Sequence, residues 1–144
     1  MKITICSSVN FTPNIKEVSD KLIGLGHEVN IPTTSRRIIS GELTLEEYLR
    51  EKEANGDKKF RQGGADLIKR YYNYIKTSDA ILVLNLDKKG VKNYVGGSVL
   101  MEIGFAHVLD KKIYFYNDLP DMPYSDELKA VKSIIIHGDL SKII

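Results

Sequence analysis

Short apolar runs alternate with helical patterns along this chain, and that alternation restricts the fold more than any other feature. The run DAILVLN (79–85) is almost continuously apolar, which is typical of a strand covered on both faces in a parallel sheet. Further strands are predicted at KITIC (2–6), HEVNIP (27–32), KKIYFYN (111–117) and SIIIHG (133–138), with helical patterns at 14–26, 65–78, 98–109 and 125–132. The sequence therefore predicts an α/β fold: a doubly wound, flavodoxin- or Rossmann-like parallel sheet of five strands in three αβα layers.

The length of the chain predicts one domain spanning 1–144, because 144 residues can bury one sizeable core but not two. The regular alternation lapses over 33–64, a segment rich in charge and glycine with one helical patch, LTLEEYLREKEA (43–54). We expect this segment to be an insertion that lies over the active site.

Charge and composition exclude several classes of partner. The chain has 21 basic and 19 acidic residues spread along its length, so neither a nucleic acid polymer nor a membrane surface is an expected partner. The single cysteine, Cys6, and three histidines have no metal-ligand spacing, and we expect no metal and no cofactor. With no signal peptide and no apolar run of about 18 residues, the expected compartment is cytoplasmic.

Glu102 is the most unusual residue of the chain, because it lies alone in the apolar run GGSVLMEIGFAHVL (96–109). If 98–109 is a helix, its neighbours three and four residues away are Ser98, Val99, Phe105 and Ala106, and none is basic. A buried carboxylate needs hydrogen-bond donors, a raised pKa or a chemical role. The structural alternative is a carboxylate satisfied by backbone donors at the start of its helix.

Ligands of doubly wound sheets bind beyond the carboxyl ends of the strands. The glycines and serine at 96–98 place backbone N–H groups at a helix start, an environment that suits phosphate, although a plain turn is the alternative. No GxGxxG follows the first strand and no GxxxxGKS is present, which disfavours a dinucleotide or P-loop enzyme. Asn85 either caps its loop or contacts substrate. The candidate substrate-binding residues lie in the loops that follow the first and third predicted strands. They are Ser7, Ser8, Asn10, Asn85, Gly96, Gly97 and Ser98.

The stretch SDAILVLN, its glycine-containing loop and then MEIGFAHVLDKKIYFYN resembles the nucleoside 2-deoxyribosyltransferase family and its relatives that hydrolyse 2'-deoxynucleoside 5'-monophosphates. The resemblance covers the first strand and 67–117. It implies that Glu102 is a nucleophile that attacks the anomeric carbon of the sugar and forms a glycosyl-enzyme intermediate. The family's first-strand tyrosine is replaced here by Thr4 or Ile5, and its catalytic aspartate by Tyr71, our second candidate catalytic residue.

The expected function is therefore cleavage of the N-glycosidic bond of a nucleoside or (deoxy)nucleoside 5'-monophosphate, by a hydrolase or a base-exchange transferase. The alternative is a catalytically inactive nucleotide-binding or sensing module on the same fold. The apolar helix at 98–109 predicts a homodimer. The resemblance implies that the segment after the fourth strand, including Asn117, then reaches the substrate of the neighbouring subunit.

Overall fold

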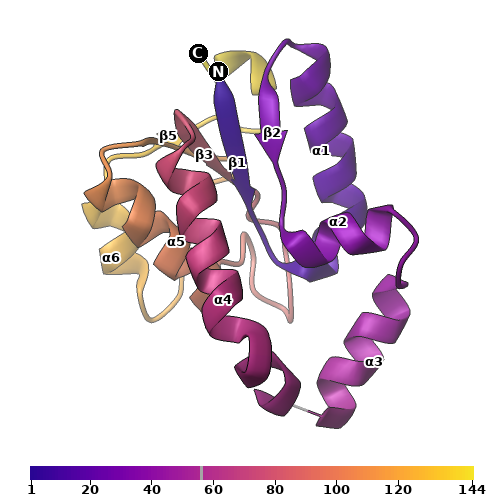
Figure 1. Cartoon of the computed structure of the whole chain (residues 1–144). Coiled ribbons are helices and arrows are strands. Elements are labelled where there is room, and N and C mark those ends of the chain that lie inside the picture. The colour runs from indigo at the N-terminus through magenta and orange to yellow at the C-terminus, as the bar shows by residue number, and fades with distance from the viewer. Residues whose placement is uncertain (56) are drawn as a thin grey trace.

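One parallel sheet of five strands, in the order β2-β1-β3-β4-β5, forms the centre of the molecule (Figure 1). The computed structural model describes residues 1–55 and 57–144, with side chains described outside 55–65. The strands are β1 (Lys2–Cys6), β2 (Glu28–Asn30), β3 (Ala80–Val83), β4 (Lys112–Phe115) and β5 (Ile134–Ile135). This is the flavodoxin-like order of doubly wound sheets, so the predicted fold class is confirmed.

Helices cover both faces of the sheet and complete three layers. They are α1 (Thr12–Gly24), α2 (Thr33–Ile39), α3 (Leu45–Asn55), α4 (Asp57–Lys76), α5 (Gly97–Val108) and α6 (Ser125–Ala130), with 3₁₀ turns η1 (Val9–Phe11) and η2 (Leu140–Lys142). Within the described residues, no helix combines the length and the apolar character needed to cross a bilayer.

The two apolar cores follow from the alternation of side chains along each strand. Ile3 and Ile5 of β1 face the core under α1, whereas Cys6 faces the core under α4, α5 and α6. In β3, Leu82 faces the first core and Ile81 the second, and all four residues of the strand are buried. A strand buried on both faces must be apolar at every position, which is why 79–85 carries so strong a signal.

The chain reverses its direction of winding between β1 and β3, and this reversal positions the candidate site. From β1 the chain continues through α1 to β2, while from β3 it continues through α5 to β4 on the other side. Cys6 and Val83 are paired neighbours at the carboxyl ends of these two strands. The loops that follow therefore separate, and α2 lies near the carboxyl end of β1 (Figure 1).

Helix content between 33 and 64 differs from the expectation. The sequence analysis predicts one helix there, whereas the structure contains α2, α3 and the first part of α4, which starts at Asp57 and not at residue 65. The short α2 has no long apolar stripe and is held by tertiary contacts: Ser35 is fully buried, and its Oγ lies 2.9 Å from Oγ1 of Thr12. That this segment is an insertion stays a prediction, and its residue 56 lies outside the described residues.

Candidate functional site

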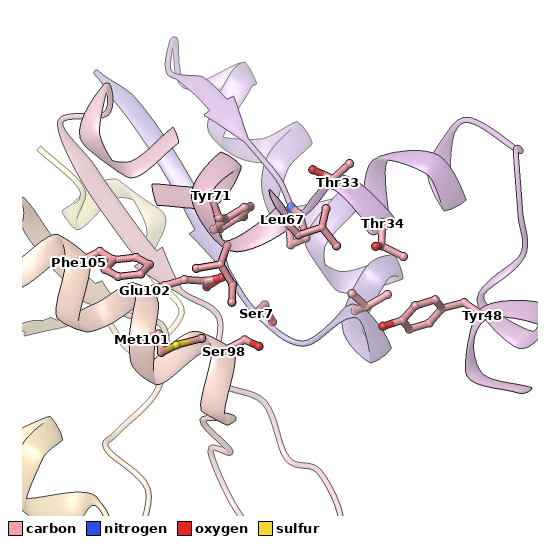
Figure 2. A pocket seen from close by; sticks show the side chains of 13 residues that line it. Ser7, Thr33, Thr34, Tyr48, Leu67, Tyr71, Ser98, Met101, Glu102 and Phe105 are labelled. Carbon is pink, nitrogen blue, oxygen red and sulfur yellow. The ribbon is translucent and has the colours of Figure 1, made fainter. Parts of the chain in front are cut away.

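Glu102 lies in the second turn of α5 and reaches into a cavity of about 120 Å³ (Figure 2). Its side chain extends toward the middle of the cavity, and Tyr48 enters from α3 at the far side. The wall is largely apolar and comes from five segments of the chain. It consists of Ser7, Val9, Pro32, Thr33, Thr34, Tyr48, Leu67, Ile68, Tyr71, Ser98, Met101, Glu102 and Phe105.

The carboxyl group of Glu102 is poorly satisfied. Its Oε2 atom is buried and has no hydrogen-bond partner among the described residues, so backbone donors at the helix start do not satisfy this oxygen. Burial raises the pKa of Glu102 to about 8, while the interaction with the Cys6 thiol acts in the opposite direction. Burial therefore favours the protonated form of Glu102 at neutral pH.

Tyr71 projects from α4 into the same cavity, next to Glu102. Its ring is buried, and its hydroxyl donates a hydrogen bond to the backbone carbonyl of Ile5 in β1. Burial, followed by the nearby Cys6 and Glu102, raises the pKa of Tyr71 well above its ordinary value. The phenol is thus tied to the sheet, and its proton is already committed to a carbonyl.

A second cavity of about 350 Å³ adjoins the first, since Ser7, Val9, Tyr48 and Ser98 line both. Six of the predicted substrate-binding residues line the second cavity: Ser7, Ser8, Asn10, Gly96, Gly97 and Ser98. They come from the segment after β1 and from the start of α5, as the doubly wound topology requires.

Lys88 and Lys52 also line the second cavity, and sequence reasoning did not identify them. The Nζ atom of Lys88 donates to Oγ of Ser8 at 2.9 Å and lies 5.3 Å from the ring centroid of Tyr94. Burial, then the charges of Lys52 and Lys89, lowers the pKa of Lys88. In the sequence, the only indication of a role for Lys88 was its position in the glycine-containing loop after β3. Its contact with Ser8 exists only in the folded chain. The second cavity therefore combines a cation with an α-helix start.

A side chain at position 96 would crowd Tyr94 at this helix start. A Cβ atom added there would lie 3.3 Å from the Tyr94 ring, which is tighter than ordinary contact. The glycine thus lets Tyr94 pack beside the first turn of α5, where the same ring meets Lys88.

Asn85 and Asn117 bind each other instead of lining either of these two cavities. Oδ1 of Asn85 accepts from the backbone N–H of Asn117 at 2.9 Å, and its Nδ2 donates to the carbonyl of Asp118 at 2.9 Å. Nδ2 of Asn117 in turn donates to the carbonyl of Asn85 at 3.0 Å. The pair joins the loops after β3 and β4, and the structure does not bring it to the other candidate residues of this chain.

Among the described residues, no three His, Cys, Asp or Glu side chains form a group that could hold a metal ion.

Comparisons with known proteins give a distant likeness among solved structures. No family model matches the chain, and no curated protein matches it. Among solved structures, the chain is similar to the Clostridium botulinum CMP N-glycosidase BcmB, with 15% sequence identity and a TM-score of 0.47. The alignment covers 94% of this chain and 89% of that enzyme. The N-glycosidase activity is a property of that protein.

Proposed function

We propose that this protein cleaves the N-glycosidic bond of a nucleoside or nucleoside 5'-monophosphate, with Glu102 as the nucleophile. The observation that carries the proposal is the buried Oε2 of Glu102, which has no hydrogen-bond partner among the described residues and lies at a cavity beyond the carboxyl ends of β1 and β3. The Glu-Ile-Gly-Phe-Ala motif at 102–106, which resembles the glycosyl-transferring family, supports the same assignment.

The chemistry requires an ionised Glu102. A carboxylate oxygen attacks the anomeric carbon while the bond from that carbon to the base nitrogen breaks, and the base leaves with the bonding electrons and takes up a proton from water. Water or a second base then attacks the anomeric carbon of the glycosyl ester, and the Glu102 carboxylate leaves. Because the reacting carbon is cationic in the transition state, the transition state favours the ionised carboxylate, which burial alone disfavours.

The two cavities suit different parts of such a substrate. The apolar wall around Tyr71, Met101 and Phe105 suits a planar base, and in this proposal Tyr71 packs against it without acting as an acid. The second cavity, with Lys88 and the N–H groups at 97–98, suits a 5'-phosphate. We therefore expect a 5'-monophosphate to be preferred over a nucleoside, and hydrolysis over base exchange.

A binding or sensing module is the second candidate function, and two observations favour it. Tyr71 stands where the resembled family has a catalytic aspartate, and its hydroxyl is engaged by Ile5. Burial raises the pKa of Glu102 to about 8 and so favours its protonated form at neutral pH. A chain that kept the cavities and lost turnover would have these features.

Free-base release separates the two functions. The protein is incubated with a panel of nucleosides and their 5'-monophosphates, and the products are separated by chromatography. Glycosidic cleavage predicts a free base from at least one compound, with Glu102→Gln as the blank. Tight binding of a 5'-monophosphate without any free base would instead establish the binding module.

Assembly as a homodimer is part of the proposal. Exposed positions on α5 form an apolar stripe, with Met101 42% and Val108 72% exposed and open space around Gly104 between them. Beside the stripe, Tyr72 of α4 packs edge-to-face on Phe105 with ring centroids 5.4 Å apart. Apolar and aromatic surface of this kind is enriched in homodimer interfaces, and a two-fold contact here would bring the partner next to the first cavity.

A further inference from the structure

Helix α3 lies beside the two cavities and presents one face to them. It packs against η1, the turn that follows β1, and against α4. Tyr48 lines both cavities, and Lys52, one helical turn later, lines the second. Because residues four apart share a face of an α-helix, a single face of α3 is directed at both cavities.

The wall that the two cavities share is the place for the sugar of a nucleotide. The residues that line both cavities are Ser7, Val9, Tyr48 and Ser98. In a nucleoside 5'-monophosphate the sugar connects the base to the phosphate. This step rests on the proposed function: with the base in the first cavity and the phosphate in the second, the sugar lies against the shared wall.

Tyr48 has the hydroxyl best placed to bind a sugar at this wall. Val9 has no polar side-chain atom, Ser98 is exposed to solvent, and Ser7 donates its proton to the carbonyl of Leu84 at 2.8 Å. Tyr48 is half-buried and directs its hydroxyl toward the cavity, where that hydroxyl has no hydrogen-bond partner within the described part of the chain (Figure 2). Burial raises the pKa of Tyr48, so the phenol keeps its proton and remains a donor at neutral pH.

The charges in the second cavity suit an anionic ligand. Among the described residues that line it, Lys52 and Lys88 are cationic and none is acidic. Lys52 has no salt-bridge partner among the side chains described outside 55–65. Burial, and then the charge of Lys52, lowers the pKa of Lys88. A dianion between two such cations would relieve their repulsion, and a 5'-phosphate carries a charge of about −1.5 to −2 at pH 7.

We propose that α3 is a nucleotide-binding element, in which Tyr48 donates a hydrogen bond to a hydroxyl of the sugar and Lys52, together with Lys88, binds the 5'-phosphate. The helix then contacts the ligand through two side chains on one face. These contacts select ligands that have both a free sugar hydroxyl and a phosphate, and they give α3 a role in binding and not in bond cleavage.

Calorimetric binding to the Glu102→Gln protein tests the proposal, because this variant should bind the nucleotide without consuming it. The 5'-monophosphates of adenosine, guanosine, cytidine and uridine are compared with their 2'-deoxy and 2',3'-dideoxy forms. Tyr48→Phe should weaken binding by about fivefold where the contacted hydroxyl is present, and should not affect the dideoxy form. The 2'-deoxy form tells whether that hydroxyl is at the 2' or the 3' position.

Lys52→Gln should weaken binding of the same monophosphate by about tenfold and binding of its nucleoside by less than about twofold. Arg50→Gln is the matched control, because it also removes one positive charge from α3. Arg50 pairs with Glu46 at 2.9 Å and lines neither of the two cavities, so its loss should weaken binding by less than about twofold. Circular dichroism checks that each variant is folded.

The proposal is overturned by unchanged affinity in Tyr48→Phe or Lys52→Gln, by an equal loss in Arg50→Gln, or by failure of every monophosphate to bind. None of these measurements uses turnover. A protein with the expected losses whose wild-type form releases no base would refute the proposed cleavage alone. Base release by the wild type, with unchanged binding in the α3 variants, would refute only the role of α3.

Discussion

Tyr71 and Ile5 are joined by a hydrogen bond from the phenol hydroxyl of α4 to a backbone carbonyl of β1, directly beside Glu102. The bond fixes the wall of the first cavity to the central sheet. It also explains why a tyrosine at this position is a poor proton donor to a leaving base, since its proton is already used and burial raises its pKa.

Tyr71→Phe should therefore affect stability more than chemistry. Loss of the hydroxyl should lower the free energy of unfolding by about 1 kcal/mol, and base release should fall by less than about tenfold, since one neutral hydrogen bond is at stake. Tyr72→Phe is the matched control, because it removes a hydroxyl from the neighbouring residue of α4 and keeps the ring that packs edge-to-face on Phe105. Urea denaturation and product chromatography measure the two effects. Activity as low as that of Glu102→Gln would show that the Tyr71 hydroxyl takes part in the reaction.

Glu102→Gln should abolish base release while leaving the fold intact. The amide has nearly the shape of the carboxyl group but cannot form the glycosyl ester, so the expected loss is at least about 1000-fold, as for removal of a covalent nucleophile. Circular dichroism checks the fold, and chromatography measures the free base. Wild-type turnover in this variant would exclude Glu102 as the nucleophile.

The same substitution should stabilise the protein at alkaline pH. Folding raises the pKa of Glu102 from 4.5 to about 8, so the folded state binds the proton more tightly than the unfolded state. The contribution of Glu102 to stability is therefore complete below about pH 4.5 and is lost progressively as the pH rises to about 8. Glu102→Gln, which cannot ionise, should gain on the order of a few kcal/mol over wild type between pH 5 and pH 8.5. Parallel denaturation curves at the two pH values measure the gain, and an equal difference at both would mean that Glu102 titrates normally.

Lys88→Gln should reduce the preference for a 5'-monophosphate. The lysine supplies a charge-assisted hydrogen bond in the second cavity, and its loss should lower kcat/KM for the monophosphate by about 10- to 100-fold. The nucleoside should be affected little. The neighbouring exposed Lys89→Gln is the control for a general change of charge. Equal losses for nucleoside and monophosphate would place the phosphate elsewhere.

Val108→Lys should convert a dimer to a monomer. The lysine charge would have to be buried in the dimer interface on the apolar stripe of α5, which costs free energy. In the monomer the same charge stays in water. Ile23→Lys on α1, another exposed apolar position, serves as the control and should leave the dimer intact. Light scattering at micromolar concentration measures the mass. A monomeric wild-type protein, with activity undiminished on dilution, would remove the dimer from the proposal.

The sequence by itself determined the five parallel strands and the helix that carries Glu102. Burial of a sheet on both faces imposes a local pattern, so 79–85 and 98–109 could be recognised without any partner segment. The strands are shorter than predicted, as for β5, which comprises two residues where six were expected, because pairing with a neighbour decides where a strand ends.

Only the tertiary structure decided which side chains meet. Lys88 follows β3 and Ser8 follows β1, yet they touch across 80 positions of sequence because the two strands are neighbours in the sheet. Asn85 was predicted either to cap its loop or to contact substrate, and its hydrogen bonds with Asn117 join the loops after β3 and β4, a pairing that no local pattern indicates. The short helix α2 likewise depends on the contact between Ser35 and Thr12. Local patterns report burial, whereas hydrogen-bond partners depend on distances that exist only after the chain has folded.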